Sequence, residues 1–300
     1  MFRAIAIVGP TAVGKTELSL DLAEMLGGEI INADSMQLYR GMDIGTAKIP
    51  ESQRRGIPHH LLDVLDVTQA ANVSDYQRAA REVIATLTNQ GKVPIMVGGS
   101  GLFVNAVLDD MQFPGSDADI RARLISESQQ LGLPAMYQRL VDVDPQAAAQ
   151  VLPTNERRVL RALEVYEVTG HAPKTSLPEL PEVIPSLRIG LRRDRSELDV
   201  RIDQRVDQMW DQGFVAEVQV LEKRGLRNGL TASQALGYKQ ILSALAGECS
   251  MEQAKIDTAS GTRRYVRRQE AWFKRDSKIH WLDATTVTAK DIAVTFNLLP

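Results

Sequence analysis

A glycine-rich loop near the start of the chain limits its fold more than any other feature. The loop reads Gly9, Pro10, Thr11, Ala12, Val13, Gly14, Lys15 and Thr16, which matches the P-loop pattern G-x-x-x-x-G-K-[ST]. The apolar run at residues 4–8 predicts a buried strand before it, and the pattern at residues 16–26 predicts a helix after it. A P-loop in this setting indicates an α/β fold.

The alternation of strands and helices continues through the first part of the chain. Residues 29–33, 60–65 and 93–97 predict further strands, and residues 75–89 predict a helix between two of them. Strands of a parallel sheet are buried on both faces and therefore form short apolar runs such as these. The pattern predicts a doubly wound parallel sheet.

Helical patterns replace strand patterns between residues 114 and 185. The predicted helices are at residues 117–131, 134–141, 145–151 and 155–169, and a proline-rich connector follows at 171–185. A strand at 187–191, helices within 199–276 and a last strand at 279–282 complete the chain. We predict a P-loop α/β core (residues 1–113 and 186–300) with a helical insertion domain (residues 114–185). A second independent domain on a long linker would give nearly the same pattern.

The composition is that of an ordinary globular protein. Of the 300 residues, 44% are hydrophobic and 24% are charged, which argues against a disordered chain or a coiled-coil rod. No stretch nears the roughly 18 apolar residues of a membrane span, so we expect a cytoplasmic protein without a membrane contact. With 35 basic and 38 acidic residues the net charge is -3, so any nucleic-acid site must be a local patch. The single cysteine, Cys249, and the scattered histidines offer no metal-ligand spacing.

The P-loop residues predict a site for a diphosphate. The glycines let the backbone curl so that successive amides point inward, and the N-terminus of the following helix adds partial positive charge. Lys15 is suited to outer phosphate oxygens, and the Thr16 hydroxyl is suited to Mg²⁺. The loop alone does not distinguish a nucleoside triphosphate from another diphosphate.

A second glycine-rich segment weakens the case for an ATPase or a kinase. Such enzymes use a carboxylate at the end of a neighbouring strand to hold magnesium, whereas the strand at 93–97 runs into Gly98, Gly99, Ser100 and Gly101. These glycines allow close backbone approach, and the Ser100 hydroxyl is suited to stabilising a leaving diphosphate. On the P-loop alone, a kinase is the alternative.

Asp34 follows the predicted second strand and is the candidate general base. In a doubly wound sheet this position lies at the carboxyl edge, where the P-loop opens. A carboxylate there can take a proton from a nucleophile or bind magnesium indirectly, and Gln37 can pair with an adenine edge. The structural alternative is that Asp34 caps a following helix.

Two basic segments are candidates for nucleic-acid contacts. Arg157, Arg158 and Arg161 share one face of the helix at 155–169, although an ordinary solvated face is the alternative there. Residues 263–278 hold seven basic side chains against two acidic ones, interleaved with aromatic residues, which suits phosphates and stacked bases. The basic residues that we assign to RNA in this segment are Arg263, Arg267, Arg268 and Lys274.

The stretch at residues 32–48 (NADSMQLYRGMDIGTAK) resembles the long signature of bacterial tRNA dimethylallyltransferases, also called tRNA isopentenyltransferases. Residues 9–16 resemble the P-loop of that family, residues 97–103 its second glycine loop, residues 157–170 its tRNA-contacting helix, and residues 235–240 and 262–273 its C-terminal segments. The resemblance therefore covers most of the chain. Ser100 stands where the family commonly has threonine, which keeps the hydroxyl, and Phe103 stands where tyrosine is common, which removes one.

This resemblance implies transfer of a dimethylallyl group from dimethylallyl diphosphate to N6 of adenosine 37 in tRNA, with release of diphosphate. Asp34 would draw off the amine proton, while Lys15, Ser100 and Mg²⁺ held by Thr16 would stabilise the leaving group. The adenine would be flipped out of the anticodon arm into a crevice. The residues expected around it are Asp34, Ser35, Met36, Gln37 and Ser100.

The resemblance also implies two contacts without deciding which residue makes them. Either Arg201 or Arg205 is expected to reach the diphosphate, although surface ion pairing with neighbouring aspartates is the alternative. Either Arg121 or Arg123 is expected to contact the anticodon stem-loop of tRNA together with the arginines of the helix at 155–169. We expect the protein to act as a monomer.

Three other functions share parts of the pattern. A small-molecule or nucleoside kinase would use the P-loop with ATP, and a non-catalytic RNA-binding protein would use only the basic faces. An enzyme that prenylates a free adenine nucleotide would share the chemistry. The basic helices favour a polymer, because a mononucleotide needs no extended cationic surface.

Overall fold

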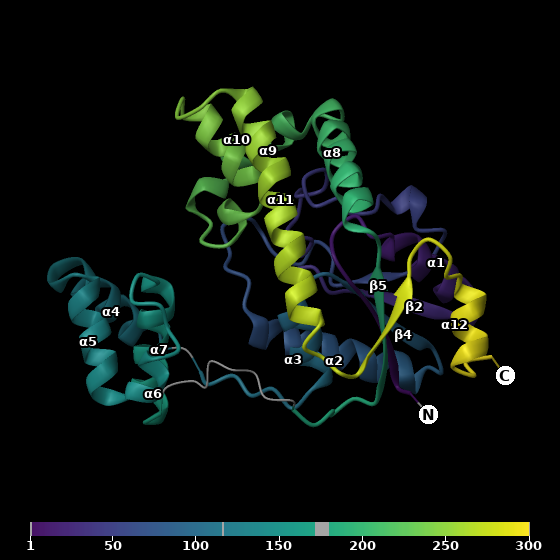
Figure 1. Cartoon of the computed structure of the whole chain (residues 1–300), viewed down its shortest axis with the longest axis horizontal. Helices are drawn as coiled ribbons and strands as arrows, with labels where there is room; N and C mark the ends of the chain where they lie inside the picture. Colours follow the sequence, from purple (N-terminus) through teal and green to yellow (C-terminus); the bar gives the residue numbers. More distant parts are fainter. Residues whose placement is uncertain (1, 116, 172–179, 300) are drawn as a thin grey trace. The chain divides into compact units, whose positions relative to one another are not determined.

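Six parallel strands form the central sheet of this computed structural model, which describes residues 2–115, 117–171 and 180–299 (Figure 1). The strands are β1 (Ala4–Val8), β2 (Gly28–Asn32), β3 (His59–His60), β4 (Val93–Gly98), β5 (Ser186–Arg192) and β6 (Ile279–Asp283). Their order across the sheet is β3-β2-β4-β1-β5-β6. Ile5 pairs with Ile95 of β4 on one side and with Leu187 of β5 on the other, so β1 lies inside the sheet. The predicted doubly wound parallel sheet is confirmed.

Helices cover both faces of the sheet. Alternate side chains of β1 face opposite ways: Ile5 and Ile7 join the hydrophobic cluster of α1 (Lys15–Leu26) and α12 (Ala289–Thr295). The intervening alanines and Val8 join the cluster of α2 (Val73–Asn89) and α3 (Gly101–Leu108). Because both faces are covered, every residue of β1 is buried, which explains its continuous apolar sequence.

Four further helices of the core gather beyond one end of the sheet (Figure 1). They are α8 (Arg195–Asp211), α9 (Phe214–Lys223), α10 (Tyr238–Leu245) and α11 (Met251–Phe273), with short 3₁₀ turns at η2 (Leu226–Asn228) and η3 (Ala232–Gln234). Another 3₁₀ turn, η1 (Glu51–Gln53), lies between β2 and β3 in the chain. Phe214 and Tyr238 pack edge to face in their hydrophobic cluster, with ring centroids 4.8 Å apart. The long helix α11 runs back to the sheet, where Phe273 joins the cluster of α2 and α3.

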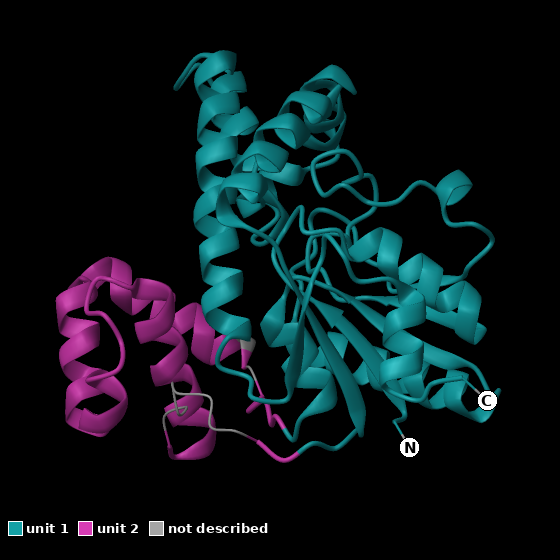
Figure 2. Cartoon of the chain, turned by 45° about the vertical axis from the view of Figure 1, so that its right-hand side comes forward, with its two compact units in different colours: residues 1–110, 182–300 teal, residues 111–181 magenta. Residues whose placement is uncertain are grey.

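The segment Met111–Pro181 forms a separate compact unit (Figure 2). It consists of α4 (Ala118–Leu131), α5 (Leu133–Val143), α6 (Pro145–Ala148) and α7 (Glu156–Thr169), which bury their own hydrophobic cluster. Its bounds differ by a few residues from the 114–185 of the sequence prediction, and residues 172–179 of the expected connector lie outside the described residues. In the part of the chain that the structure describes, no helix is both long and apolar enough to cross a membrane.

A buried ion cluster fixes the two segments at which the insertion leaves the core. Arg188 on β5 is 1% exposed and binds both carboxylate oxygens of Asp109, with Nη2–Oδ1 at 2.6 Å and Nη1–Oδ2 at 3.2 Å. Its guanidinium also lies 3.1 Å from a Glu182 oxygen and 2.7 Å from an Asp276 oxygen. Asp109 and Glu182 are also paired by an antiparallel bridge, so the chain leaves and re-enters the core at one place.

The strand expected at residues 60–65 is wrong in extent, because β3 consists only of His59–His60. Leu61 and Asp63 have φ of 60° and 57°, a left-handed conformation that ends the extended backbone. The Asn32 side chain donates to the Leu61 carbonyl at 3.0 Å, and the Lys48 ammonium lies 2.6 Å from the Asp63 carboxylate. These two side chains hold a turn where the sequence predicted a strand.

Candidate functional site

The loop between β1 and α1 has the geometry of a phosphate-binding loop. The Lys15 ammonium donates to the carbonyl oxygens of Gly9 at 3.0 Å and Pro10 at 2.8 Å. Gly14 precedes α1 with φ of 115°, a conformation that suits glycine. A Cβ on Gly9 would lie 2.7 Å from the Leu191 carbonyl oxygen, so the loop passes too close to β5 for any side chain. The Lys15 side chain thus folds back over the loop that precedes α1.

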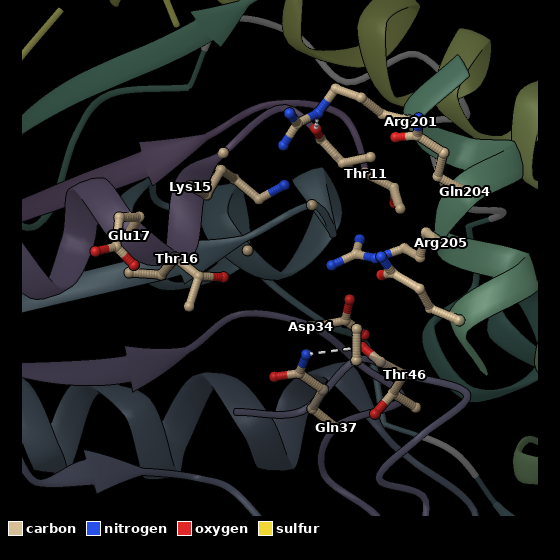
Figure 3. Close-up of a pocket in the computed structure, with 17 residues that line it drawn as sticks. Thr11, Lys15, Thr16, Glu17, Asp34, Gln37, Thr46, Arg201, Gln204 and Arg205 are labelled. Carbon is tan, nitrogen blue, oxygen red and sulfur yellow. Dashed lines mark hydrogen bonds between the residues drawn. The ribbon is translucent and has the colours of Figure 1, made fainter. Parts of the chain in front are cut away.

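A cavity of about 480 Å³ opens beside this loop (Figure 3). Besides the P-loop, its wall includes Asp34 and Gln37 after β2, Thr46 and Ala47, Gly98 and Gly99 at the end of β4, and Arg201 and Arg205 of α8. Figure 3 shows the Lys15 and Arg205 side chains pointing into the cavity from different sides. The carboxyl ends of β1, β2 and β4 are neighbours in the sheet, so loops that are distant in sequence meet here.

Basic side chains outnumber acidic ones on the wall of this cavity, three to two. Arg201 donates from Nε to the Ala12 carbonyl at 2.7 Å, so both predicted arginines of α8 line the cavity. Burial and the positive charge of Arg205 lower the pKa of the Lys15 ammonium to about 7, against the opposing influence of the Asp34 carboxylate. Burial and the charge of Arg201 likewise lower the pKa of Arg205. Such crowded cations favour binding of a polyanion, which would relieve their repulsion.

Asp34 is held in a turn at the end of β2. Its backbone N–H donates to the Asn32 side chain at 2.9 Å, and its own Oδ1 accepts from the Met36 N–H at 2.9 Å. No helix follows, so Asp34 does not cap one. Burial raises the pKa of the Asp34 carboxyl, although the Met36 N–H and the charge of Lys15 act to lower it. A carboxylate with a raised pKa is a stronger base than an exposed one.

A second cavity of about 270 Å³ adjoins the first. Thr11, Asp34 and Arg205 are on the walls of both cavities. The second cavity adds apolar side chains of α8 and aromatic side chains of α10 and α11, namely Ile202, Val206, Met209, Tyr238 and Tyr265. Asp34 therefore stands where a charged cavity meets a more apolar one.

The second glycine loop owes its glycines to close packing. A Cβ on Gly98 would lie 2.1 Å from the Ala33 carbonyl oxygen, and a Cβ on Gly101 would lie 2.1 Å from the Trp272 ring. The Ser100 hydroxyl accepts from the Ser35 N–H at 3.2 Å and so supports the turn that carries Asp34. Ser100 is not among the residues on the wall of either cavity, and its contact with the leaving diphosphate stays a prediction.

The residues expected around adenine divide between the two cavities. Ser35 and Met36 line the second cavity, whereas Gln37 lines the first. The Gln37 amide donates to the Thr46 carbonyl at 3.0 Å, which Figure 3 marks as a dashed line. Pairing of Gln37 with an adenine edge stays a prediction, and it would require this amide to turn.

Three of the predicted RNA-contacting arginines gather within the helical unit. Arg121 of α4 and Arg157 and Arg161 of α7 line a depression of about 320 Å³. Arg161 also donates to the Pro114 carbonyl at 2.9 Å, whereas the Arg121 and Arg157 side chains are exposed. Arg158 is exposed as well but is not on the wall of this depression.

Arg123 lies in a different setting from Arg121. Its guanidinium forms ion pairs with Glu127, at 2.7 Å, and with Glu167 of α7. Both carboxylates also pair with Arg139 of α5, at 2.7 Å and 2.6 Å. Together these four side chains join three helices of the unit, which indicates a structural role for Arg123.

The basic residues assigned to RNA near the end of the chain lie on or just after α11. The Arg268 guanidinium stands over the Tyr265 ring at 5.7 Å from its centroid, and both residues line the second cavity. Arg263 instead pairs with Asp203 at 2.8 Å. The exposed members of the set are Arg267, Arg268 and Lys274.

The cavity wall carries oxygen donors that fit Mg²⁺. This ion is usually held by one or two protein oxygens together with substrate phosphates. Thr16 and Asp34 offer a hydroxyl and a carboxylate on the same cavity. Among the residues described here, no group of three histidine, cysteine or acidic side chains could hold a metal ion.

The sequence did not single out two residues that shape the site. Glu217 on α9 accepts from three successive backbone N–H groups at residues 43–45, the shortest at 2.7 Å from Ile44, and from the Tyr238 hydroxyl at 2.6 Å. It thereby holds the loop that carries Thr46. Gln269 on α11 contacts both glycine loops. Neither residue has a local sequence signal, although Gln269 lies in the block at 262–273 that resembles a family segment.

Comparisons with known proteins all point to the same family. A family model described as IPP transferase matches residues 37–276. A tRNA dimethylallyltransferase of Thermobifida fusca is 58% identical over 287 residues, covering 94% of this chain and 90% of that protein. One of Streptomyces coelicolor is 54% identical over 280 residues, with coverage of 93% and 90%.

Solved structures agree with this result. The tRNA isopentenylpyrophosphate transferase of Bacillus halodurans is 39% identical, with a TM-score of 0.73 and coverage of 99% of this chain and 95% of that one. A eukaryotic dimethylallyltransferase acting on tRNA is 28% identical, with a TM-score of 0.84 and coverage of 98% and 78%. This chain, with its P-loop, its basic cavity and its carboxylate at the end of β2, belongs to the IPP transferase family.

Proposed function

We propose that this protein transfers a dimethylallyl group from dimethylallyl diphosphate to N6 of adenosine 37 in tRNA and releases diphosphate. The observation that carries the proposal is the position of Asp34 on the walls of two adjoining cavities, one basic and one more apolar. Family membership and the names of the relatives support it. A kinase is not favoured, because β4 runs into glycines with no carboxylate at its end.

The basic cavity would hold the diphosphate. Lys15, Arg201 and Arg205 are in position to bind its oxygens, and the curled P-loop adds backbone amides. When the carbon–oxygen bond to the diphosphate breaks, its electron pair stays with the departing oxygen. The fixed cations stabilise that growing charge, and stabilisation confined to the transition state speeds the reaction.

Asp34 would act as the general base. The exocyclic amine of adenine is a weak nucleophile because its lone pair is conjugated with the ring. As the new bond between N6 and the allylic carbon forms, an N6 proton passes to the Asp34 carboxylate, which balances the step. The bond from the Met36 N–H orients this carboxylate before the substrates arrive, and the bond from the Asp34 backbone N–H to Asn32 holds the turn. A positioned base of this kind contributes roughly 10²–10⁴-fold to the rate.

Mg²⁺ fits the first cavity as a partner of the diphosphate. The Thr16 hydroxyl would hold it directly, and Asp34 would contact it through water. When bound, it would neutralise charge on the leaving diphosphate. Binding of the amine and acceptance of its proton would still fall to the protein's own side chains.

The adenosine must leave its stack to reach Asp34. Flipping a base costs a few kcal/mol, so contacts elsewhere on the RNA must offset it. Arg121, Arg157 and Arg161 of the helical unit and the basic residues of α11 would supply contacts to phosphates of the anticodon stem-loop. We propose that the protein does this as a monomer in the cytoplasm, where tRNA is found.

Incubation with an unmodified anticodon stem-loop, dimethylallyl diphosphate and Mg²⁺ tests the proposal. Mass measurement of the digested nucleosides should find one dimethylallyl group on adenosine, with release of an equal amount of diphosphate. A stem-loop with guanosine at position 37 should stay unmodified, and so should free AMP. Phosphate transfer from labelled ATP, with no prenylated product, would instead identify a kinase.

A further inference from the structure

Gln269 of α11 bridges the two glycine loops of the site. Its side-chain oxygen accepts from the Thr11 backbone N–H at 3.0 Å and from the Thr11 hydroxyl at 3.3 Å. Its side-chain nitrogen donates to the Gly99 carbonyl at 3.0 Å. The residue is only 4% exposed, so these bonds form away from solvent, where an unmade bond is costly.

The three hydrogen bonds of Gln269 require an amide group and not merely a side chain of this size. One end of the group faces two donors and the other end faces an acceptor, so a flipped amide would oppose like groups at both ends. A carboxylate could accept from Thr11 but would confront the Gly99 carbonyl with another acceptor. A thioether of similar length could make neither strong bond.

The neighbouring backbone is shaped around this contact. A Cβ on Gly99 would lie 2.1 Å from the Gln269 side-chain nitrogen. A glycine is therefore needed at position 99 to leave space for the Gln269 side chain, whether or not its backbone N–H binds phosphate.

We infer that Gln269 is a positioning residue for the proposed transfer: it fixes the P-loop at Thr11 against the loop after β4 at Gly99. Both bridged residues are on the wall of the basic cavity, whereas Gln269 is not. The Thr11 N–H is occupied by this bond, so the diphosphate must be bound by the remaining groups of the loop, held in the position that Gln269 sets. The inference rests on the proposed function.

Replacing Gln269 with methionine, which removes the hydrogen bonds at similar length, tests this role. We expect kcat/KM for dimethylallyl diphosphate to fall about 10–100-fold, as is usual for residues that orient binding groups, with KM for the stem-loop unchanged. The matched control is Gln253→Met on the same helix, because the exposed Gln253 amide donates only to Asp257 among the bonds found here. It should behave as the wild type does.

A second variant, Gln269→Glu, separates positioning from folding. Its protonated carboxyl group can donate to Gly99 and accept from Thr11 as the amide does, whereas its carboxylate cannot donate. The reduction in kcat/KM of Gln269→Glu relative to the wild type should therefore become smaller as pH falls. A purely structural role predicts lower thermal stability with unchanged KM and kcat, and that result would overturn the inference.

Binding of inorganic diphosphate, followed by calorimetry, separates this inference from the proposed function. If the wild type binds diphosphate but modifies no stem-loop, the function is wrong, and weaker binding by both Gln269 variants still supports the bridge. If the wild type modifies the stem-loop while both variants keep its binding and turnover, only the inference is wrong.

Discussion

Lys15 and Asp34 face one cavity from the carboxyl ends of two strands, and each shifts the pKa of the other. Lys15 follows β1 and Asp34 follows β2, with β4 between these strands in the sheet. A group that binds an anion and a group that accepts a proton thus share one small space. Their protonation states should determine how the protein responds to pH.

The affinity for diphosphate should fall as pH rises above the Lys15 pKa of about 7. An anion binds the charged ammonium and so raises its pKa, which means that binding takes up a proton. Kd should be constant below pH 7 and then rise by up to about tenfold per pH unit. Calorimetry with inorganic diphosphate measures this, and proton uptake is read from buffers of different ionisation enthalpy. In Lys15→Arg, Kd should not rise in this way, since arginine stays charged. An equal rise of Kd in both proteins would show that Lys15 does not cause it.

Replacing Asp34 with asparagine should reduce kcat by roughly 10²–10⁴-fold and leave binding of the stem-loop nearly unchanged. The asparagine oxygen can still accept from the Met36 N–H, so the turn should survive. Single-turnover kinetics and a filter-binding titration measure the two quantities. Normal single-turnover chemistry with lost RNA binding would show that Asp34 binds RNA and is not the base.

Removing the charge of Arg121 and Arg157 should weaken RNA binding and flatten its dependence on salt. Each lost phosphate contact should reduce the slope of log K against log salt by about 1. Arg123→Gln is the matched control, because Arg123 is already paired with Glu127 and Glu167. It should lower thermal stability and keep the salt slope; the reverse pattern would make Arg123 the RNA contact.

Replacing Arg188 with methionine should destabilise the core by about 3–5 kcal/mol, because it removes the buried cation that the carboxylates of Asp109, Glu182 and Asp276 share. Urea unfolding followed by circular dichroism measures this. Arg78→Met provides the control, since the Arg78–Asp75 pair is exposed at 70% and 61% and should contribute little. Equal loss in the two variants would mean that the Arg188 cluster contributes no more than a surface pair.

Acid should weaken the same cluster through Asp109. Burial acts to raise the pKa of Asp109, but hydrogen bonds from Arg188, Asn105 and Lys278 outweigh it and leave the pKa lowered. The resulting stability is fully present above the unfolded-state value of about 3.9 and is lost as pH falls through the lower native value. Urea midpoints of the wild type and Asp109→Asn should therefore converge in acid, and a constant difference would contradict this assignment.

The sequence predicted the elements whose signals are local. The apolar run at 4–8 became β1 with identical bounds, since burial on both faces makes every position apolar. The P-loop needs only its own glycines and lysine, so its place before α1 could also be predicted. The expected strand at 60–65 failed because Leu61 and Asp63 are bound in a turn by side chains from elsewhere in the chain.

The residues that the sequence could not assign to a role are distinguished by contacts between distant segments of the chain. Arg121 and Arg123 were not distinguished from the sequence, and the ion pairs of Arg123 with Glu127 and with Glu167 on another helix separate them. Arg201 and Arg205 posed the same choice, and both line the cavity. Gln269 could not be found at all, because its partners Thr11 and Gly99 lie more than half the chain away.

The pairing of Asp109 with Glu182 has a consequence for how this architecture can diverge. The inserted helical unit begins and ends at neighbouring points of the core, so it does not change the order of the strands. The sheet can therefore form whatever helices are inserted between these two points. Evolution can lengthen, shorten or exchange those helices to suit a different nucleic acid without touching the chemistry at the strand ends.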